Sequence, residues 1–484
     1  MNYASSLDEQ YLEFHAKTTG VFEQYPQLEC LRNFVFKELL VQRKAVGWKD
    51  FAKHWLRPLV RRGHATDDLT PTDVVILIES SREVIVEALL PVYYELMSRG
   101  LKVRLVSFSS PEKLPDETIQ LTFQARSRAP AWAEPAWNGL CDVVPEFRCD
   151  ALRRSFYYAS AGLGALLDEV NRILARLKPK IVLIASTQLS GGSAFMVAAR
   201  SREAYTLLLQ HGVLQPFYVP VIADKMVTWG ESSNDVLIGL GVGGERLAVL
   251  GSPRHDTMVP AGNGRARKAL LESIGRPDKP TFVFFSNGND LVRNGTAPEE
   301  CAKWLESAAE KYSKDVNVVI RLHPNEDGSL YMNCPHLTIT KGSPDLAVLL
   351  EGSDWVGSLC STVLYDALLF EKPVWQFYAD AWPELADNWR RGLATRIASE
   401  ADFIAMVGQV LREGGGAVDV SLSTRVFANH GYATRAVADF VEQSVEQRLN
   451  GADVMAPFQQ PVESLLVKRL SSRAEIASGN HRSF

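Results

Sequence analysis

The sequence predicts an α/β protein of two doubly wound, Rossmann-like lobes facing a central cleft, with an N-terminal helical extension. Short runs of β-branched and aliphatic residues recur along the chain and alternate with helical stretches, which is typical of parallel sheets. These runs form two series of nearly equal length. A chain of 484 residues is long enough for two or three domains.

The first series begins with a strand at 74–78, a helix at 82–98 and a strand at 101–108. Its later strands are expected at 181–185, 206–210 and 247–251. The second series has expected strands at 281–286, 316–322, 337–340, 355–358 and 373–377. We therefore expect a helical region at 1–66, lobes at 67–255 and 256–440, and a C-terminal helix with a flexible tail at 441–484.

Composition excludes several classes of protein. Hydrophobic residues make up 46% of the chain and charged residues 23%, which argues against wholesale disorder. A net charge of -5 does not suit a nucleic-acid-binding polycation. The acidic N-terminus is unlike a secretory signal, and six cysteines without a C-x-x-C pair favour a reducing cytoplasm. Polar residues interrupt the uncharged stretch between Lys180 and Arg200, so no membrane span is expected.

Two segments could bring the protein into contact with the inner face of a membrane. Basic residues interleaved with aromatic ones occur between Leu31 and His64, and 462–473 has a short amphipathic pattern. The basic segment could lie on anionic lipid as a peripheral contact. A helical cap with solvated basic residues is the favoured alternative, since exposed charge is the default on helices.

Polar residues follow the predicted strands at the points where the strands end. Glu79 follows the first strand, Gln210 and His211 follow 206–210, and Asn287 follows 281–286. Because the carboxyl ends of parallel strands line the ligand crevice of doubly wound sheets, we expect these side chains to face the cleft.

The segment 321–328 has the composition of a phosphate site. Arg321 and His323 lie two residues apart at a strand end, so they share one face while the chain is extended. A guanidinium and an imidazole suit a phosphate or pyrophosphate. The alternative is a solvated strand end with a hydrogen-bonded histidine.

A second phosphate site is expected where the helix after 355–358 begins. Ser361 and Thr362 lie at its start, where hydroxyls and unpaired backbone N–H groups can bind an anion. Taken alone, an ordinary helix cap is the more common explanation. Asp366 lies about one turn further and could position the hydroxyls or hold a donor hydroxyl.

His211 is the candidate general base, because histidine titrates near neutrality and a glycine follows it. Glu79 is the alternative base, and a structural histidine is the competing explanation. The GLGVGG segment at 239–244 matches a dinucleotide fingerprint, but a helix-like stretch precedes it and a strand follows it, so we reject NAD binding. No metal-ligand spacing is present in the sequence.

The segments 210–212, 229–231, 249–256, 321–324 and 360–380 together resemble the CDP-glycerol glycerophosphotransferase family of wall teichoic acid and capsule synthesis. More loosely, they resemble bacterial sialyltransferases and Kdo transferases. These families have the GT-B architecture. The resemblance implies that Arg321 and His323 contact the donor phosphates, that Ser361 and Thr362 bind the distal phosphate, and that His211 serves the acceptor. It also matches Asp366 to an acid of the family in a supporting role. We further expect Asn287 to belong to the phosphate site, and Gln210 and Arg254 to have supporting roles.

The resemblance implies a metal-independent transferase that moves a sugar or polyol-phosphate group from a CMP- or CDP-activated donor to a surface polysaccharide or lipid-linked acceptor. The lobe at 67–255 would be the acceptor side and the lobe at 256–440 the donor side. No cofactor beyond the nucleotide-activated substrate and no nucleic acid is implied. A UDP-sugar transferase or 2-epimerase of the same fold, or a catalytically silent scaffold in a polysaccharide assembly complex, are the alternatives.

Overall fold

The computed structural model describes residues 7–44, 69–80, 82–108, 114–121, 128–287, 296–382, 388–414, 419 and 421–449. The chain forms two compact units, Met1–Arg254 with Ala428–Phe484, and His255–Phe427. The first boundary lies next to the expected one at 255. The second lies at 427 and not at 440, because the C-terminal helix α16 (Ala433–Leu449) packs in the first unit.

The first unit contains a seven-stranded parallel sheet in the order β3-β2-β1-β4-β5-β6-β7. Its strands are β1 (Val74–Ile78), β2 (Val103–Ser107), β3 (Ile119–Gln120), β4 (Ile181–Ile184), β5 (Tyr205–Leu209), β6 (Lys225–Thr228) and β7 (Leu247–Val249). The sequence pattern misses β3 and β6, because both are short and β6 begins with a lysine. The order grows outward from β1 in both directions, as in a doubly wound sheet.

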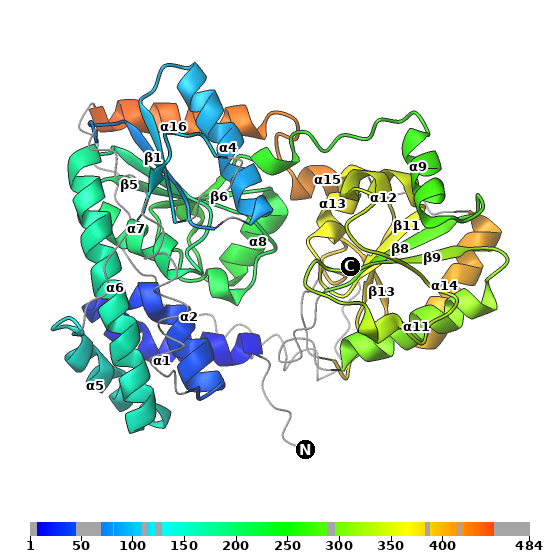
Figure 1. The fold of residues 1–484 in the computed structure, drawn as a ribbon, viewed down its shortest axis with the longest axis horizontal. Coiled ribbons are helices and arrows are strands. Elements are labelled where there is room, and N and C mark those ends of the chain that lie inside the picture. The colour runs from blue at the N-terminus through cyan, green and yellow to red at the C-terminus, as the bar shows by residue number, and fades with distance from the viewer. Residues whose placement is uncertain are drawn as a thin grey trace. The chain divides into compact units, whose positions relative to one another are not determined.

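Helices cover both faces of this sheet. Val75 and Leu77 of β1 face one apolar cluster, to which α6 (Asp150–Leu177) and α7 (Ser190–Arg200) contribute. The alternate residues of β1 face a second cluster, formed with α4 (Glu83–Ser98) and α16. Figure 1 shows α16, in orange, beside α4, and Arg99 after α4 bonds Asp439 of α16 at 2.6 Å.

Further helices complete the unit. They are α1 (Leu7–Gln24), η1 (Pro26–Leu31), α2 (Arg32–Phe34), η2 (Val35–Val41), α5 (Ala133–Val143), η4 (Pro145–Phe147), η5 (Pro216–Tyr218), α8 (Glu231–Gly239), η6 (Gly244–Arg246) and η7 (Pro253–His255), whose last residue is the first of the second unit. The segment 239–244 lies between α8 and β7, so the predicted helix-to-strand turn is confirmed.

The N-terminal helices are packed into the first unit, and one of their basic residues is neither solvated nor available to lipid. Arg32 is buried and forms a paired contact with Glu29, its Nε lying 2.7 Å from Oε2. Its Nη1 also lies 3.0 Å from Nδ1 of His15, which is buried too. The rest of the expected basic face beyond residue 44, and the segment 462–473, lie outside the described residues. Within the described ranges, no helix combines the length and apolar character that a membrane crossing requires.

The second unit contains a six-stranded parallel sheet in the order β10-β9-β8-β11-β12-β13. Its strands are β8 (Thr281–Phe285), β9 (Asn317–Arg321), β10 (Thr338–Thr340), β11 (Trp355–Ser358), β12 (Val374–Phe377) and β13 (Thr395–Ile397). The sequence pattern misses β13, which is a short edge strand with an exposed threonine and a half-buried arginine.

Buried aromatic residues hold the second unit together. Phe282 of β8 stacks on Trp375 of β12 at 5.1 Å, and Phe403 packs against both rings. The helices are α9 (Arg265–Ile274), α11 (Ala297–Lys311), η8 (Ser329–Tyr331), α12 (Leu346–Gly352), α13 (Val363–Leu369), α14 (Glu400–Glu413) and α15 (Ser421–Val426).

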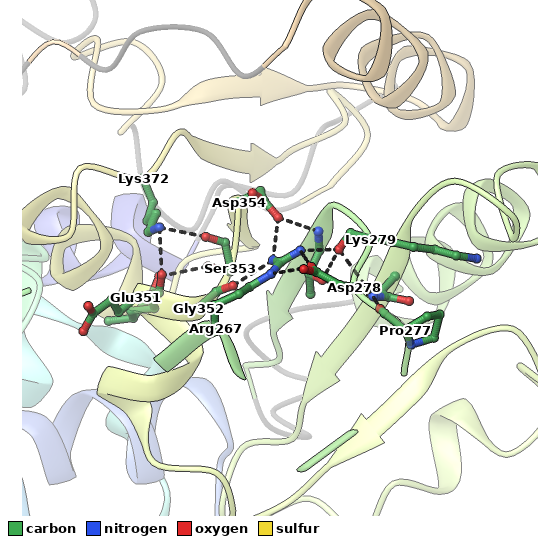
Figure 2. A network of polar contacts seen from close by, with 12 residues as sticks. Arg267, Pro277, Asp278, Lys279, Glu351, Gly352, Ser353, Asp354 and Lys372 are labelled. Atoms are coloured by element: carbon green, nitrogen blue, oxygen red, sulfur yellow. Dashed lines mark hydrogen bonds and ion pairs between the residues drawn. The ribbon is translucent and has the colours of Figure 1, made fainter. Parts of the chain in front are cut away.

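A polar network ties α9 to the amino ends of β8 and β11 (Figure 2). Arg267 donates to Asp354 at 2.7 Å and to Asp278 at 3.0 Å, and Asp354 also accepts from the backbone N–H of Thr281. Lys372 donates to the carbonyl oxygens of Glu351 and Ser353 in the same region. These contacts lie at the sheet edge opposite the carboxyl ends, so their role is to fix the unit's framework.

Candidate functional site

The strand order of the second unit creates a crevice between β8 and β11. The chain starts at β8, adds β9 and β10 on one side, and then returns to add β11, β12 and β13 on the other. Loops that leave β8 and β11 therefore diverge at their carboxyl ends, which is where doubly wound sheets bind ligands. The predicted residues Asn287, His323, Ser361 and Thr362 all follow β8, β9 or β11.

Asn287 bridges the two strands that flank this crevice. Its Oδ1 accepts a hydrogen bond from Ser358 Oγ at 2.8 Å and one from the backbone N–H of Cys360 at 3.3 Å. Its Nδ2 lies 3.0 Å from Cys360 Sγ. The amide therefore holds the segment before α13 against the end of β8.

Ser286, the residue before Asn287, makes the matching connection to β9. Its Oγ accepts from the backbone N–H of His323 at 2.7 Å and donates to the carboxylate of Glu326. Glu326 is buried and its Oε2 also accepts from the N–H of His323 at 3.0 Å. Glu326 was not predicted from the sequence, although an acid three residues after the histidine of a histidine-proline pair is a visible signal.

The imidazole of His323 is oriented by its own turn. The backbone N–H of Asn325 donates to His323 Nδ1 at 3.2 Å. Since Nδ1 accepts, the neutral ring carries its proton on Nε2. His323 can therefore donate a hydrogen bond from Nε2, which suits a phosphate oxygen.

Arg321 is directed toward the β10 side of the sheet. Its Nη2 donates to the carbonyl oxygen of Gly342 at 2.8 Å, while its buried Nη1 has no hydrogen-bond partner among the described residues. Burial lowers the pKa of the guanidinium, although Asp345 opposes that effect. Arg321 and His323 were expected to converge on one ligand. Among the described residues no direct contact joins them, because the carbonyl oxygen of Gly342 holds the guanidinium of Arg321.

Ser361 and Thr362 lie at the start of α13, as expected, and both are half-buried. Ser361 Oγ accepts from the N–H of Val363 at 3.3 Å, whereas Thr362, the N-cap residue, makes no capping bond with its side chain. The backbone N–H of Ser361 also donates to Ser358 Oγ at 3.3 Å, which connects the start of α13 to the Asn287 bridge.

The expectation for Asp366 is wrong. The structure buries it completely on the inner side of α13, where its Oδ1 lies 2.8 Å from Nε2 of His255. His255 is also fully buried and packs on the ring of Phe427 at 4.4 Å. Asp366 is therefore a structural partner of His255 and not a ligand for the hydroxyls of Ser361 and Thr362.

The first unit has the corresponding crevice between β1 and β4, and Glu79 follows β1 at this point. Glu79 is 7% exposed, and neither carboxyl oxygen has a hydrogen-bond partner among the described residues. Burial raises the pKa of this carboxyl to about 8, opposed by smaller effects of the backbone N–H of Glu79 itself and then of Arg82. Glu79 consequently keeps its proton at neutral pH and is poorly suited to the predicted role of base.

His211 is in the state that a base requires. Its Nδ1–H donates to the carbonyl oxygen of Ala185, which follows β4, so Nε2 carries the lone pair. Burial lowers the pKa of His211 to about 4, and the positive charges of Arg82 and Arg254 act in the same direction. Tyr218, which was not predicted, lies 3.5 Å from Nδ1 and is buried beside the ring.

Gln210 and Arg254 have supporting positions around His211. The side chain of Gln210 bonds backbone groups, accepting from Trp229 N–H at 3.0 Å and donating to the carbonyl oxygen of Gly212 at 3.0 Å. It thus fixes the turn that carries His211. Arg254 bonds Glu87 at 3.2 Å and contributes positive charge near His211. Among the described residues, no group of three or more histidine, cysteine or acidic side chains is arranged to hold a metal ion.

Comparisons with known proteins show which fold this chain shares with them. No family model and no curated protein matches the sequence. Among solved structures, UDP-GlcNAc 2-epimerase from Methanocaldococcus jannaschii has a TM-score of 0.52 at 13% identity, over 76% of this chain and 99% of that one. MnaA from S. aureus with UDP has a TM-score of 0.53 at 12% identity, over 78% and 97% of the two chains.

The wall teichoic acid polymerase TagF has a TM-score of 0.46 at 12% identity, over 89% of this chain and 99% of that one, which is too low to support an inference. The similarity to these two structures shows that each half of the predicted architecture is present, and the chain has the GT-B fold. At these identities the similarity assigns no family within that fold.

Proposed function

We propose that this protein is an enzyme that binds a nucleotide-activated donor at the β8–β11 crevice of the second unit and transfers the activated group to a hydroxyl acceptor. The observation that carries the proposal is the continuous set of polar contacts across the carboxyl ends of β9, β8 and β11. Ser286 and Glu326 fix the His323 turn, and Asn287 fixes the segment before Ser361. Such fixed donors at a switch point suit a phosphate group.

In the proposed reaction, an acceptor oxygen forms a bond to the transferred carbon or phosphorus atom. The bond between that atom and the nucleotide's phosphate oxygen breaks, and its electron pair stays on the departing phosphate. The Nε2–H of His323 and the hydroxyls of Ser361 and Thr362 stabilise that charge, with Arg321 adding positive potential. The proton of the acceptor hydroxyl passes to Nε2 of His211.

CMP and CDP are the first nucleotides to test, because the sequence motifs resemble those of families that use them. Calorimetric titration of CMP, CDP and UDP into the wild type and the His323→Ala variant tests the site. We expect one nucleotide to bind the wild type at least tenfold more tightly than the variant, and turnover with its activated donor to fall ~100-fold or more in the variant. Near-normal turnover in the variant would contradict the assignment of His323. No binding of any of the three nucleotides would favour a non-catalytic scaffold.

The second candidate is a UDP-sugar 2-epimerase, which the similarity to the UDP-GlcNAc 2-epimerase from Methanocaldococcus jannaschii supports. An epimerase converts its UDP-sugar without any acceptor. Incubation with UDP-GlcNAc alone, followed by proton NMR of the anomeric signals, separates the two functions. A new anomeric signal in the absence of acceptor would support epimerisation and contradict transfer.

A further inference from the structure

The buried acid Glu79 lies beneath the first turn of α7 in the first unit. Val75 and Leu77 of β1 belong to the apolar cluster that includes Ala194 and Phe195 of α7. Val74, Ile76 and Ile78 face the opposite cluster. Because side chains alternate along a strand, Glu79 continues the row of Val75 and Leu77 toward α7.

The first turn of α7 rests on the two neighbours of Glu79 in the sheet. In the parallel register, Ile78 pairs with Ser107 and Leu77 with Ile184, so Phe108 and Ser186 are the residues on either side of Glu79. A Cβ added to Gly191 would lie 2.4 Å from the ring of Phe108, and one added to Gly192 would lie 1.9 Å from the carbonyl oxygen of Ser186. The helix start therefore spans the position of Glu79.

The N-cap residue of α7 gives no side-chain hydrogen bond to the start of the helix. The helix has 11 residues and its N-cap residue is Leu189, which offers no hydrogen-bond acceptor in its side chain. The first N–H groups of a helix have no acceptor within the helix, and they carry the positive end of its dipole. Such a start is suited to an anion that arrives from outside the chain.

Glu79 provides the second, independent feature of this place. Its side chain is more than nine-tenths buried, and its two oxygens have no hydrogen-bond partner among the described residues. A buried carboxylate without a partner is costly, so the group is held as the neutral acid. The charged and titratable groups that interact with it are Arg82 before α4 and Tyr218 of η5, and Arg82 also acts on His211 together with Arg254. A neutral acid differs from a carboxylate because it can donate a hydrogen bond to an anionic oxygen.

We propose that the carboxylic acid of Glu79 and the first turn of α7 bind an anionic group, a phosphate or a carboxylate, that the acceptor carries near its reacting hydroxyl. The proposal rests on the proposed function in one respect, namely that the molecule carrying the anionic group is the acceptor. It narrows the acceptor class to hydroxyl compounds with a neighbouring anionic group, and it gives the first unit its own recognition site.

The test uses glycerol 3-phosphate and glycerate as probes and glycerol as the uncharged control. Each is titrated calorimetrically into the full-length wild type, Glu79→Gln and Glu79→Met, with and without CDP. Glutamine keeps the volume and a neutral donor, whereas methionine keeps the volume without the donor. We expect at least one anionic probe to bind the wild type, and Glu79→Gln to bind it within threefold. Glu79→Met should bind it about tenfold more weakly or worse, and glycerol should give no heat.

Each of the other results would overturn the proposal. These are no heat from either anionic probe in the wild type, equal affinity in the wild type and Glu79→Met, or a Glu79→Gln variant as weak as Glu79→Met. A second readout is the pH dependence. Wild-type affinity should fall above about pH 8 as Glu79 ionises, whereas Glu79→Gln should be insensitive there.

His323→Ala separates this proposal from the proposed function. The variant should weaken nucleotide binding in the second unit and leave the affinity for the anionic probe unchanged. If the wild type binds no nucleotide, that result would count against the proposed function alone, because the probe titration without CDP still tests the anion site.

Discussion

Glu79→Gln is expected to make the protein more stable at neutral and alkaline pH. The carboxyl of Glu79 is buried without a hydrogen-bond partner among the described residues, and burial raises its pKa from 4.5 to about 8. Between these two values the unfolded chain releases a proton that the folded chain retains. The wild type therefore loses stability as pH rises from about 5 to 8, and the glutamine variant does not.

The size of the effect follows from the same two values. Each pH unit in which only the unfolded state is ionised costs 2.303RT, so the stability difference between variant and wild type should grow by about 3 kcal/mol from pH 5 to pH 8. Urea denaturation followed by tryptophan fluorescence at four pH values measures it. Buried His15 and His211 have lowered pKa values and change stability in the opposite direction below pH 6.5, but they are common to both proteins. Parallel pH profiles for wild type and variant would refute the assignment of a protonated Glu79.

Three further predictions concern other parts of the molecule. If His211 is the base, the acid limb of the pH profile of kcat/KM should lie near pH 4, because burial lowers the pKa of His211 to about 4. His211→Gln should reduce kcat by about 100-fold or more. An acid limb near pH 6.5 would contradict the assignment of His211 as the base. His255→Phe keeps a ring beside Phe427 but removes the 2.8 Å contact to buried Asp366, so the free energy of unfolding measured by urea denaturation should fall by about 3 kcal/mol. Adding Asp366→Leu should recover part of this loss. An unchanged denaturation midpoint would show that the pair has no structural role. Arg267→Met should lower the free energy of unfolding by about 2 kcal/mol, because the carbonyl oxygen of Gly352 loses its Arg267 donor and the carboxylate of Asp354 keeps the N–H of Thr281 but loses the guanidinium. The exposed control Lys268→Met should change it by less than about 0.5 kcal/mol, and equal effects of the two substitutions would indicate that the network is not specific.

The fold could be predicted because buried parallel strands have a distinctive sequence pattern. Runs such as 74–78 and 281–285 consist of apolar and small residues that are buried on both faces of the sheet. The pattern fails at β13, where an edge strand has exposed and half-buried positions. The return of α16 to the first unit was also missed, because nothing in the local sequence indicates which sheet an amphipathic helix will cover.

The candidate site could be predicted where strand ends determine it. Asn287, His211 and His323 each lie two residues after the last residue of a strand, and parallel pairing brings each of them to the carboxyl edge of its sheet. Asp366 was placed wrongly because its partner, His255, is distant in sequence and spacing on a short helix does not say which side is inward. The proton state of Glu79 was likewise not predictable, since it depends on burial by residues from several elements.

A crystal structure of the protein soaked with CMP, CDP and UDP in separate crystals tests the nucleotide site most directly. We expect a phosphate oxygen within hydrogen-bonding distance of His323 Nε2, with further oxygens beside Ser361 and the segment that Asn287 holds. A nucleotide whose phosphates bind elsewhere, with the β8–β11 crevice occupied by solvent alone, would contradict the proposal.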